Sequence, residues 1–336
     1  MAHYNQVETT GATYLHIKTQ GIDADRIWIL KMADFRLHDQ IAAPFTPLKE
    51  DGEINFDLLD KYADYMVNTH FKGIFVNGSL AEGMSMTIEE RKQLADAWMK
   101  AAKGRLQVVV HVGANCIKDS QELARHAEQI GVAAIAAFSP SYYKPENIDV
   151  LVDVMAAVAG AAPKTPFYYY DINFCTGVYI DQREFMQAAK GRIPTLRGLK
   201  NSSRELPASH NCTFVEGCQV LIGSDNQYLS ALALGIPGVV VASYLGNLFR
   251  DMRTAYQAGQ VEKAREFQVV AQNINNIRVK YGGGINVAKA MFKIFSGLDA
   301  GSVRLPLRQL SVAEYEAMEK DFRAAGLVEI ALPREQ

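Results

Sequence analysis

The sequence predicts an α/β fold, a (β/α)8 TIM barrel followed by a C-terminal helical extension. Eight short apolar runs recur along the chain from about residue 40 onward. Segments with the apolar spacing of amphipathic helices separate these runs, which is the alternation that builds parallel sheets. Most of the runs are apolar almost throughout, as is typical of strands buried on both faces. Eight such units fit a closed barrel better than an open doubly wound sheet.

The elements follow one another in a regular order. The predicted strands are residues 41–45, 73–77, 107–112, 133–138, 166–170, 195–200, 219–223 and 238–243. Predicted helices between them include 56–68, 87–102, 120–130, 149–161 and 227–234, and later ones are 260–280, 287–295 and 312–325. Thr87, with Glu90 three residues on, has the pattern of a capping box at a helix start. We expect an N-terminal extension of unknown role over 1–35, a barrel over 36–258, and C-terminal helices over 259–330 packed on the barrel.

Composition limits the possible partners. The 336 residues are 49% hydrophobic and 21% charged, with a formal net charge of −2, which is ordinary for a soluble globular protein. Because no long basic run attracts polyanions, we expect no nucleic-acid partner. The longest apolar run, near 133–138, is far too short to cross a bilayer. Residues 1–20 lack the pattern of a secretory signal, so we expect a cytoplasmic protein without membrane contact.

The cysteines and histidines do not indicate a metal centre. The cysteines are Cys116, Cys175, Cys212 and Cys218. They contain no CxxC motif and are too few for a disulfide framework in a chain of this length, so we expect reduced thiols. The seven histidines never occur at HxH or HExxH spacing. The sequence therefore predicts no metal site.

Two neighbouring strand ends carry side chains suited to imine chemistry. In such barrels the reactive groups stand at the C-terminal ends of the strands. Lys200 closes the sixth predicted strand, where burial would lower the pKa of its amine and favour Schiff-base formation. A lysine that reaches solvent at the rim is the simpler alternative. Tyr170 closes the fifth strand and can relay protons. Alternation puts Tyr168 on the same face as Tyr170 and Tyr169 on the other, where core packing explains both.

Two further strand ends carry small polar residues. Ser79 follows the second strand in a tight turn, and such turns expose backbone N–H groups that can hold a carboxylate. The residues that follow the seventh strand are Gly223, Ser224, Asp225 and Asn226. A helix N-cap explains this second group as well as ligand binding does.

Together the four strand ends resemble the dihydrodipicolinate synthase/N-acetylneuraminate lyase family over about residues 37–307. The motifs that carry the resemblance are residues 42–47, 51–55, 78–82, 111–113, 139–143, 170–173 with Gly177, and 198–200. Within the family, the animal-type N-acetylneuraminate lyases are the most similar, through residues 75–78, 168–170, 176–178 and 304–307. Cys175 stands where dihydrodipicolinate synthases carry an arginine that binds a substrate carboxylate. A thiol cannot supply the two parallel N–H donors with which a guanidinium binds a carboxylate, so a role in lysine biosynthesis is disfavoured.

The resemblance implies a class I (Schiff-base) aldolase or lyase. It would reversibly cleave a 2-keto-3-deoxy sugar acid, above all N-acetylneuraminate, to pyruvate and N-acetylmannosamine. Lys200 would form the imine, Tyr170 would move protons, and Ser79 would hold the pyruvyl carboxylate. The other residues expected at the substrate are Leu80, Ser202, Gly223, Asp225, Asn226 and Ser243, with Tyr142 of the aromatic loop as a further proton relay. The resemblance implies no metal and no organic cofactor, and a homo-oligomer, typically a tetramer.

Departures from the family pattern gather at these positions. They are Leu80 for a hydroxyl residue, Ala81 for glycine, Asn173 for proline, Asn226 for glutamate and Ala242 for serine. Ser243 beside the last of these can substitute for the serine. Three interpretations stay open: a sialate lyase with altered kinetics, a Schiff-base aldolase for a less polar aldehyde, and a non-catalytic member that binds a small molecule. The retention of both Lys200 and Tyr170 argues against the third, because a buried lysine is costly.

Overall fold

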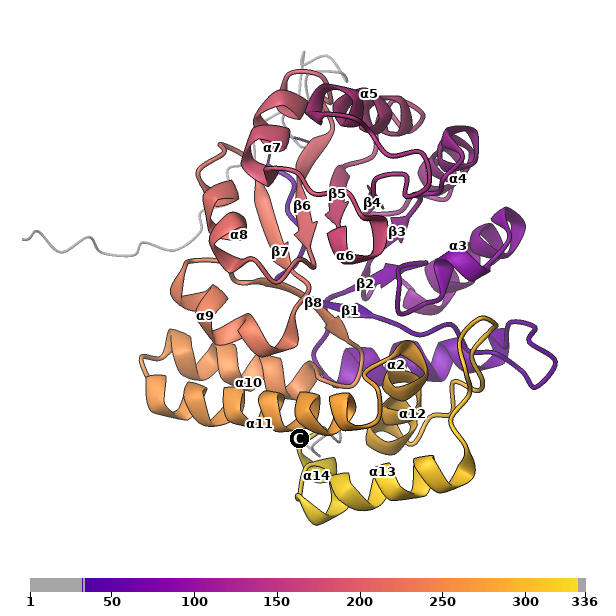
Figure 1. The fold of residues 1–336 in the computed structure, drawn as a ribbon, viewed down its shortest axis with the longest axis vertical. Helices are drawn as coiled ribbons and strands as arrows, with labels where there is room; N and C mark the ends of the chain where they lie inside the picture. Colours follow the sequence, from indigo (N-terminus) through magenta and orange to yellow (C-terminus); the bar gives the residue numbers. More distant parts are fainter. Residues whose placement is uncertain (1–31, 33, 332–336) are drawn as a thin grey trace, which may run out of the picture. The chain divides into compact units, whose positions relative to one another are not determined.

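Eight parallel strands close into a barrel and follow one another around it in sequence order, as the centre of Figure 1 shows. The strands are β1 (Gln40–Ala43), β2 (Gly73–Val76), β3 (Gln107–His111), β4 (Ala134–Ala137), β5 (Phe167–Asp171), β6 (Leu196–Asn201), β7 (Gln219–Ile222) and β8 (Gly238–Ala242). The computed structural model describes residues 32 and 34–331. Strand β1 pairs with both β2 and β8, which closes the ring. The predicted barrel is confirmed, and every strand end lies within two residues of its predicted position.

Helices cover the outside of this ring (Figure 1). They are α2 (Leu59–Asn68), α3 (Ile88–Ala102), α4 (Ile117–Gln129), α5 (Ile148–Ala159), α7 (Gln182–Lys190), α8 (Leu206–Thr213), α9 (Tyr228–Ala233) and α10 (Gly246–Gln257). The short α6 (Asn173–Thr176) instead follows β5 at the mouth of the barrel. Helix α3 begins after Thr87, whose hydroxyl accepts a hydrogen bond from the Glu90 amide at 3.2 Å. The Glu90 carboxylate accepts one from the Thr87 amide at 2.8 Å. Both bonds of the predicted capping box are therefore present.

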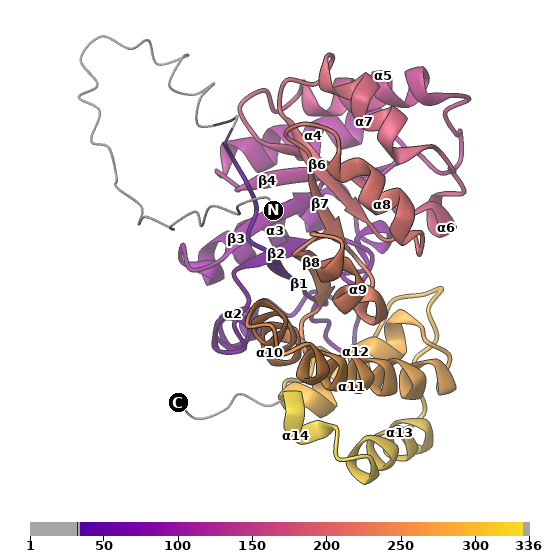
Figure 2. The same cartoon turned by 90° about the vertical axis from the view of Figure 1, so that its left-hand side faces the viewer.

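Within the described residues, four helices follow the eighth unit. They are α11 (Val261–Lys280), α12 (Ile285–Ser296), α13 (Val312–Ala324) and α14 (Val328–Ala331). Helix α11 contacts α10, α9 and the short turn Asp225–Gln227 after β7, and Figure 2 shows α10 to α14 gathered at one end of the barrel unit. Gly282 and Gly283 join α11 to α12 with φ angles of +100° and +69°, which glycine adopts most easily.

The predicted division of the chain at residues 35 and 258 stays a prediction. Nearly all of the expected extension, 1–35, lies outside the described residues. Helix α10 ends at Gln257 and α11 begins at Val261. Among the described helices, none is both long and apolar enough to cross a membrane.

Side-chain alternation decides which residues reach the inside of the barrel. Tyr168 and Tyr170 belong to the apolar cluster inside it, together with Phe75. Tyr169 belongs instead to the core between strands and helices, where its ring lies 4.4 Å from that of Phe185 on α7. The predicted alternation along β5 is confirmed, and it brings the Tyr170 ring into the barrel interior.

Candidate active site

The amine of Lys200 lies inside the barrel, away from bulk water. Lys200 pairs with Tyr170 across the β5–β6 ladder, and its neighbour Leu199 faces the outer core. Its Nζ lies 3.9 Å from the centroid of the Phe75 ring and 4.0 Å from that of Tyr170. The residue is 5% exposed, and Nζ has no hydrogen bond or ion pair within residues 34–331. The alternative of a lysine exposed at the rim is therefore wrong.

Burial controls the charge of this amine. Removal from water disfavours the ammonium form and lowers the pKa of Lys200 to about 7. No carboxylate within the described part of the chain pairs with Nζ to reverse that effect. At neutral pH a large share of the amine is thus unprotonated, and only the unprotonated amine can add to a carbonyl carbon.

The phenol of Tyr170 lies between two serine hydroxyls. Its Oη is 3.2 Å from Oγ of Ser79, which comes from the loop after β2, and it also shares a hydrogen bond with Ser202 after β6. Burial raises the pKa of Tyr170 to about 12, although both serine hydrogen bonds lower it in part. The phenol therefore stays protonated at neutral pH and is connected to groups on both sides of the cavity.

A neutral histidine packs against the ring of Tyr170. The ring of His111 on β3 meets the Tyr170 ring edge to face, with centroids 5.5 Å apart. Its Nδ1 lies 3.1 Å from the carbonyl oxygen of Asn77. Burial, together with the nearby Arg91, holds the pKa of His111 well below its usual value. Sequence reasoning noted His111 only as part of a motif, yet it fixes the position of Tyr170 without adding charge.

A cavity of about 440 Å³ contains Lys200 and Tyr170 and is bounded by the loops at the C-terminal ends of the strands. This volume falls within the range of small-molecule sites. The predicted site residues that line it are Lys200, Tyr170, Ser79, Leu80, Ser202, Gly223, Asp225 and Asn226. The structure thus brings eight of the ten predicted residues to one cavity.

The loop after β2 has backbone amides that can receive a carboxylate. The amides of Ala81, Glu82 and Gly83 donate within the loop, at 3.0 to 3.2 Å. Those of Ser79 and Leu80 donate to no residue in the described part of the chain, and both residues line the cavity. Two free amides beside a serine hydroxyl are suited to binding a carboxylate.

A buried ion pair holds this loop in place. The carboxylate of Glu82 lies 3.1 Å from Nζ of Lys289 on α12, and both side chains are at most 2% exposed. The same carboxylate accepts a hydrogen bond from the amide of Arg304 at 2.8 Å. Gly83 is required beside it, because a Cβ there would lie 2.0 Å from the carbonyl oxygen of Asn77.

Comparison with known proteins identifies the group to which this geometry belongs. The model of the dihydrodipicolinate synthetase family matches residues 36–325. The chain is 41% identical over 283 residues to an N-acetylneuraminate lyase of Pongo abelii, covering 82% of this chain and 88% of the relative. It is 41% identical over 279 residues to that of Gallus gallus, covering 81% and 91%.

The chain belongs to the dihydrodipicolinate synthetase family.

Solved structures agree with this assignment. The N-acetylneuraminate lyase of Proteus mirabilis superposes with a TM-score of 0.83 at 32% identity, covering 87% of this chain and 100% of that one. The enzyme of Aliivibrio salmonicida gives the same TM-score and identity, covering 87% and 98%. The predicted family and the enzyme class, a carbon–carbon lyase, are confirmed. No three His, Cys, Asp or Glu side chains within the described residues are grouped to hold a metal ion.

Two predicted site residues of this family member do not line the cavity. Ser243 is buried with its hydroxyl 2.5 Å from Oη of Tyr62 on α2, so its predicted substitution for the family's serine is wrong. Strand alternation is the reason: Val239 and Val241 belong to the core between strands and helices, and Ser243, two residues farther on, points to the same layer. Tyr142 is 78% exposed with its ring against Tyr143. It contacts neither Lys200 nor Tyr170, so the structure does not support a proton relay through Tyr142 within one chain.

Sequence reasoning missed several residues of the cavity wall. They are Arg204 after β6, Asn275 and Arg278 on α11, and Gly283, Gly284 and Ile285 at the start of α12. Cys175, expected at the position of the carboxylate-binding arginine of the synthases, does line the cavity, as does its neighbour Phe174. Arg204 follows the predicted Ser202 by two residues, so its place after the end of β6 was a signal that could have indicated it. Helix α11 lies beyond the eight barrel units, so no local pattern placed its side chains at the active site.

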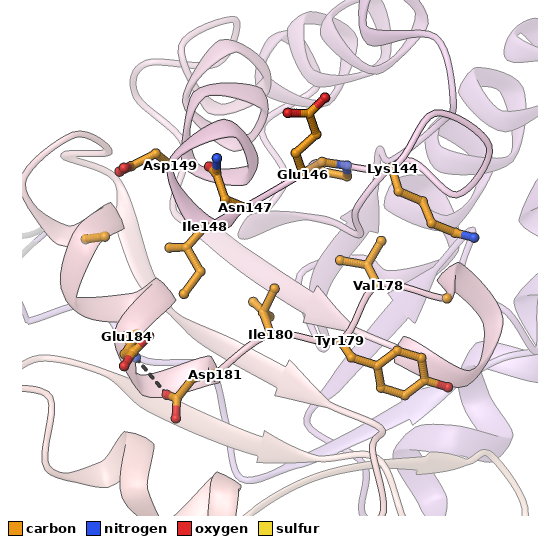
Figure 3. Close-up of a pocket in the computed structure, with 13 residues that line it drawn as sticks. Lys144, Glu146, Asn147, Ile148, Asp149, Val178, Tyr179, Ile180, Asp181 and Glu184 are labelled. Atoms are coloured by element: carbon orange, nitrogen blue, oxygen red, sulfur yellow. Dashed lines mark hydrogen bonds between the residues drawn. The ribbon is translucent and has the colours of Figure 1, made fainter.

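A second hollow, of about 810 Å³, lies on the surface and shares no lining residue with the first. Figure 3 shows its walls, formed by the segment Lys144 to Asp149 and by the segment from Gly177 to Glu184. The side chains that carry charge there are Lys144, Glu146, Asp149, Asp181 and Glu184. The single dashed contact is the amide of Glu184 donating to the Asp181 carboxylate at 2.9 Å, a helix cap. Lys144 and Tyr179 line this hollow, but neither lies in the central cavity that contains Lys200 and Tyr170.

Proposed function

We propose that this protein cleaves N-acetylneuraminate reversibly to N-acetylmannosamine and pyruvate through an imine on Lys200. The observation that carries the proposal is the buried, unpaired amine of Lys200, 4.0 Å from the Tyr170 ring, with a pKa of about 7. The relatives named N-acetylneuraminate lyase, about 40% identical, support the choice of substrate.

Imine formation uses the loop after β2 and the phenol. The open-chain substrate places its C1 carboxylate on the free amides of Ser79 and Leu80, which presents the C2 ketone to Nζ of Lys200. The amine adds to C2, and a proton passes from nitrogen to oxygen to give the carbinolamine. Tyr170 then donates its phenolic proton to the departing hydroxyl, which leaves as water. The products are a protonated imine and a tyrosinate that the adjacent cation stabilises.

Carbon–carbon cleavage uses the same two residues. The Tyr170 phenolate removes the proton of the C4 hydroxyl, whose oxygen becomes the aldehyde carbonyl as the C3–C4 bond breaks. The electron pair of that bond forms the C2–C3 double bond of an enamine, and the nitrogen of Lys200 becomes neutral. After N-acetylmannosamine leaves, the phenol protonates C3, and water hydrolyses the imine to release pyruvate. Tyr170 thus serves in turn as the acid that expels water, the base at the C4 hydroxyl and the acid at C3.

The substrate tail would lie along the loops after β6 and β7. Ser202, Asp225 and Asn226 offer it hydroxyl, carboxylate and amide groups. Gly223 keeps this wall open, since a Cβ there would lie 2.2 Å from Oγ of Ser202. Burial raises the pKa of Asp225, while the charge of Arg278 opposes that rise. These four positions are proposed as the subsite of the tail.

Borohydride trapping tests the imine. Incubation with pyruvate and borohydride should add one reduced pyruvyl group per chain, located on Lys200 by peptide mass spectrometry. Lys200→Met should abolish the adduct, and Lys190→Met, at an exposed lysine on α7, should not. Release of pyruvate from N-acetylneuraminate by the wild type would complete the test. Absence of an adduct, or an adduct elsewhere, would overturn the mechanism.

We also propose that the protein is a cytoplasmic homotetramer that requires no cofactor. Its four cysteines are all unpaired, which supports a reducing compartment. Family resemblance supports the tetramer. Light scattering of the purified protein should give a mass of four chains, and full activity should survive dialysis against a chelator. A stable monomer with full activity would contradict the assembly.

A further inference from the structure

Two arginine side chains form part of the cavity wall opposite the proposed carboxylate site. Arg204 lies in the loop after β6, and Arg278 lies in the last turns of α11. The charged residues that line the cavity are Lys200, Arg204, Asp225 and Arg278. Apart from the reactive amine, two guanidinium groups therefore face a single carboxylate.

Neither guanidinium is neutralised by an acidic side chain of the described residues. Within residues 34–331, no acidic side chain forms an ion pair with Arg204 or Arg278, and Nε of Arg278 is buried without a hydrogen-bond partner. Asp225 acts on Arg278 through its charge alone. Arg204 is exposed and Arg278 is half-buried. The fully buried Arg91, in contrast, donates to the carbonyl oxygens of His111 and Gly113. A guanidinium left unpaired beside a cavity is suited to a ligand anion.

The position of the arginines matches the far end of the substrate. Ser79 follows β2, and Arg204 follows β6, on the opposite side of an eight-stranded ring. Helix α11 lies beside the loop after β7, where Gln268 donates to the carbonyl oxygen of Asp225 at 3.4 Å. A keto acid with its carboxylate at the β2 loop and its C2 at Lys200 extends toward this side of the barrel.

We propose that the cavity recognises a 2-keto-3-deoxy acid that carries a second anionic group, a phosphate ester or a carboxylate, at the end of the tail farthest from C1. This inference rests on the proposed imine mechanism and changes the preferred substrate from N-acetylneuraminate, whose tail is neutral, to a keto acid of the same kind with a charged tail. The neutral glycerol tail of N-acetylneuraminate would leave both Arg204 and Arg278 without a counter-charge. Asn226, at the position where the family resemblance places a glutamate, removes a negative charge from the same wall.

Substrates that differ only in tail charge test the proposal. We would measure kcat/KM for N-acetylneuraminate, for its 9-phosphate ester and for the analogue oxidised to a carboxylate at C9. The wild type should prefer one charged tail by about tenfold or more, since each charge-assisted contact contributes about a factor of ten. The preferred tail identifies the anion. Arg204→Gln with Arg278→Gln should bring the values toward equality. Arg265→Gln, at a surface ion pair with Glu262 on the same helix, should leave the preference unchanged.

Trapping with pyruvate alone separates the possible failures. Pyruvate has no tail, so the double variant should still form the borohydride adduct on Lys200. Loss of that adduct would mean that the arginines serve the C1 carboxylate or the fold, and it would overturn the proposal. Equal kcat/KM for the three substrates in the wild type would also overturn it, with no variant needed. Failure of the wild type to form any adduct would instead refute the proposed function itself.

Discussion

Replacing Lys289 by methionine should destabilise the barrel strongly, because it leaves a charge buried without a partner. Glu82 and Lys289 lie 3.1 Å apart, are at most 2% exposed, and are 207 positions apart in the sequence. Burial lowers the pKa of Lys289, and the charge of Glu82 opposes that shift. Removing one member of such a pair costs about 3–5 kcal/mol. The amide of Arg304 would still donate to Glu82, which favours the lower half of this range.

Urea unfolding followed by circular dichroism measures the effect. With a slope of about 3 kcal/mol per molar urea, a loss of about 4 kcal/mol lowers the midpoint by roughly 1.3 M. The double variant Glu82→Gln with Lys289→Met should lose less than Lys289→Met alone, because no unpaired charge remains. The matched control is Lys293→Met on the same helix, whose ion pair with Asp299 is about half exposed and should contribute at most about 1 kcal/mol.

The activity of the same variants tests the link to the site. Glu82 holds the loop that carries Ser79 and Leu80, the proposed site of the C1 carboxylate. Lys289→Met should therefore loosen this loop and raise the KM for the keto-acid substrate. Lys293→Met should leave that KM unchanged. A midpoint for Lys289→Met that moves no more than that of Lys293→Met would show that the buried pair contributes little. A double variant that loses the sum of the Glu82→Gln and Lys289→Met losses would show that the two charges are not coupled, since independent sites add and paired charges do not.

Four further outcomes are expected. Because the pKa of Lys200 is about 7, kcat/KM should rise with pH through about 7, and a rise centred near 10 would contradict a buried amine. Lys200→Met should raise the free energy of unfolding at pH 7 by a few kcal/mol, because burial disfavours the ammonium form that the lysine keeps in the unfolded chain. That gain should fade as pH rises toward 10.5, where the unfolded lysine also loses its proton, and a constant gain would refute this origin. Tyr170→Phe should lower kcat by about 10²–10⁴ in a coupled pyruvate assay, and a loss below tenfold would exclude the phenol as the main proton carrier. Leu80→Thr should restore a hydrogen bond of about 1–3 kcal/mol and raise kcat/KM for N-acetylneuraminate, whereas an unchanged or lower value would show that the pocket has no use for that hydroxyl.

The sequence predicted the barrel because each strand carries its own signal. Buried parallel strands are apolar throughout, and amphipathic helices of suitable length separate them. The C-terminal end of each strand can also be read from the sequence, and this is where reactive residues of such barrels stand. The alternation that brings Tyr170 inside the barrel and Tyr169 outside follows from the period of two along one strand.

The same local logic failed where a side chain lies just past a strand end. Ser243 was expected at the substrate because it neighbours Ala242, but the strand period turns it toward Tyr62 of α2. Tyr142 was expected as a relay because its motif resembles the family loop, but its position depends on how that loop leaves β4, and its ring is 78% exposed. Spacing in sequence does not fix the direction of a side chain in a loop.

The chain alone determined the fold class and the family, and it predicted the lysine and tyrosine proposed to act together, since these depend on local pattern and residue type. Only the tertiary structure decided the charge of Lys200, because that depends on how Phe75 and Tyr170, from two other strands, exclude water from the amine. It also decided that Arg278 of α11 reaches the cavity and that Lys289 of α12 pairs with Glu82. Such contacts join segments up to 207 positions apart, and they form only when the helices after the barrel pack against it.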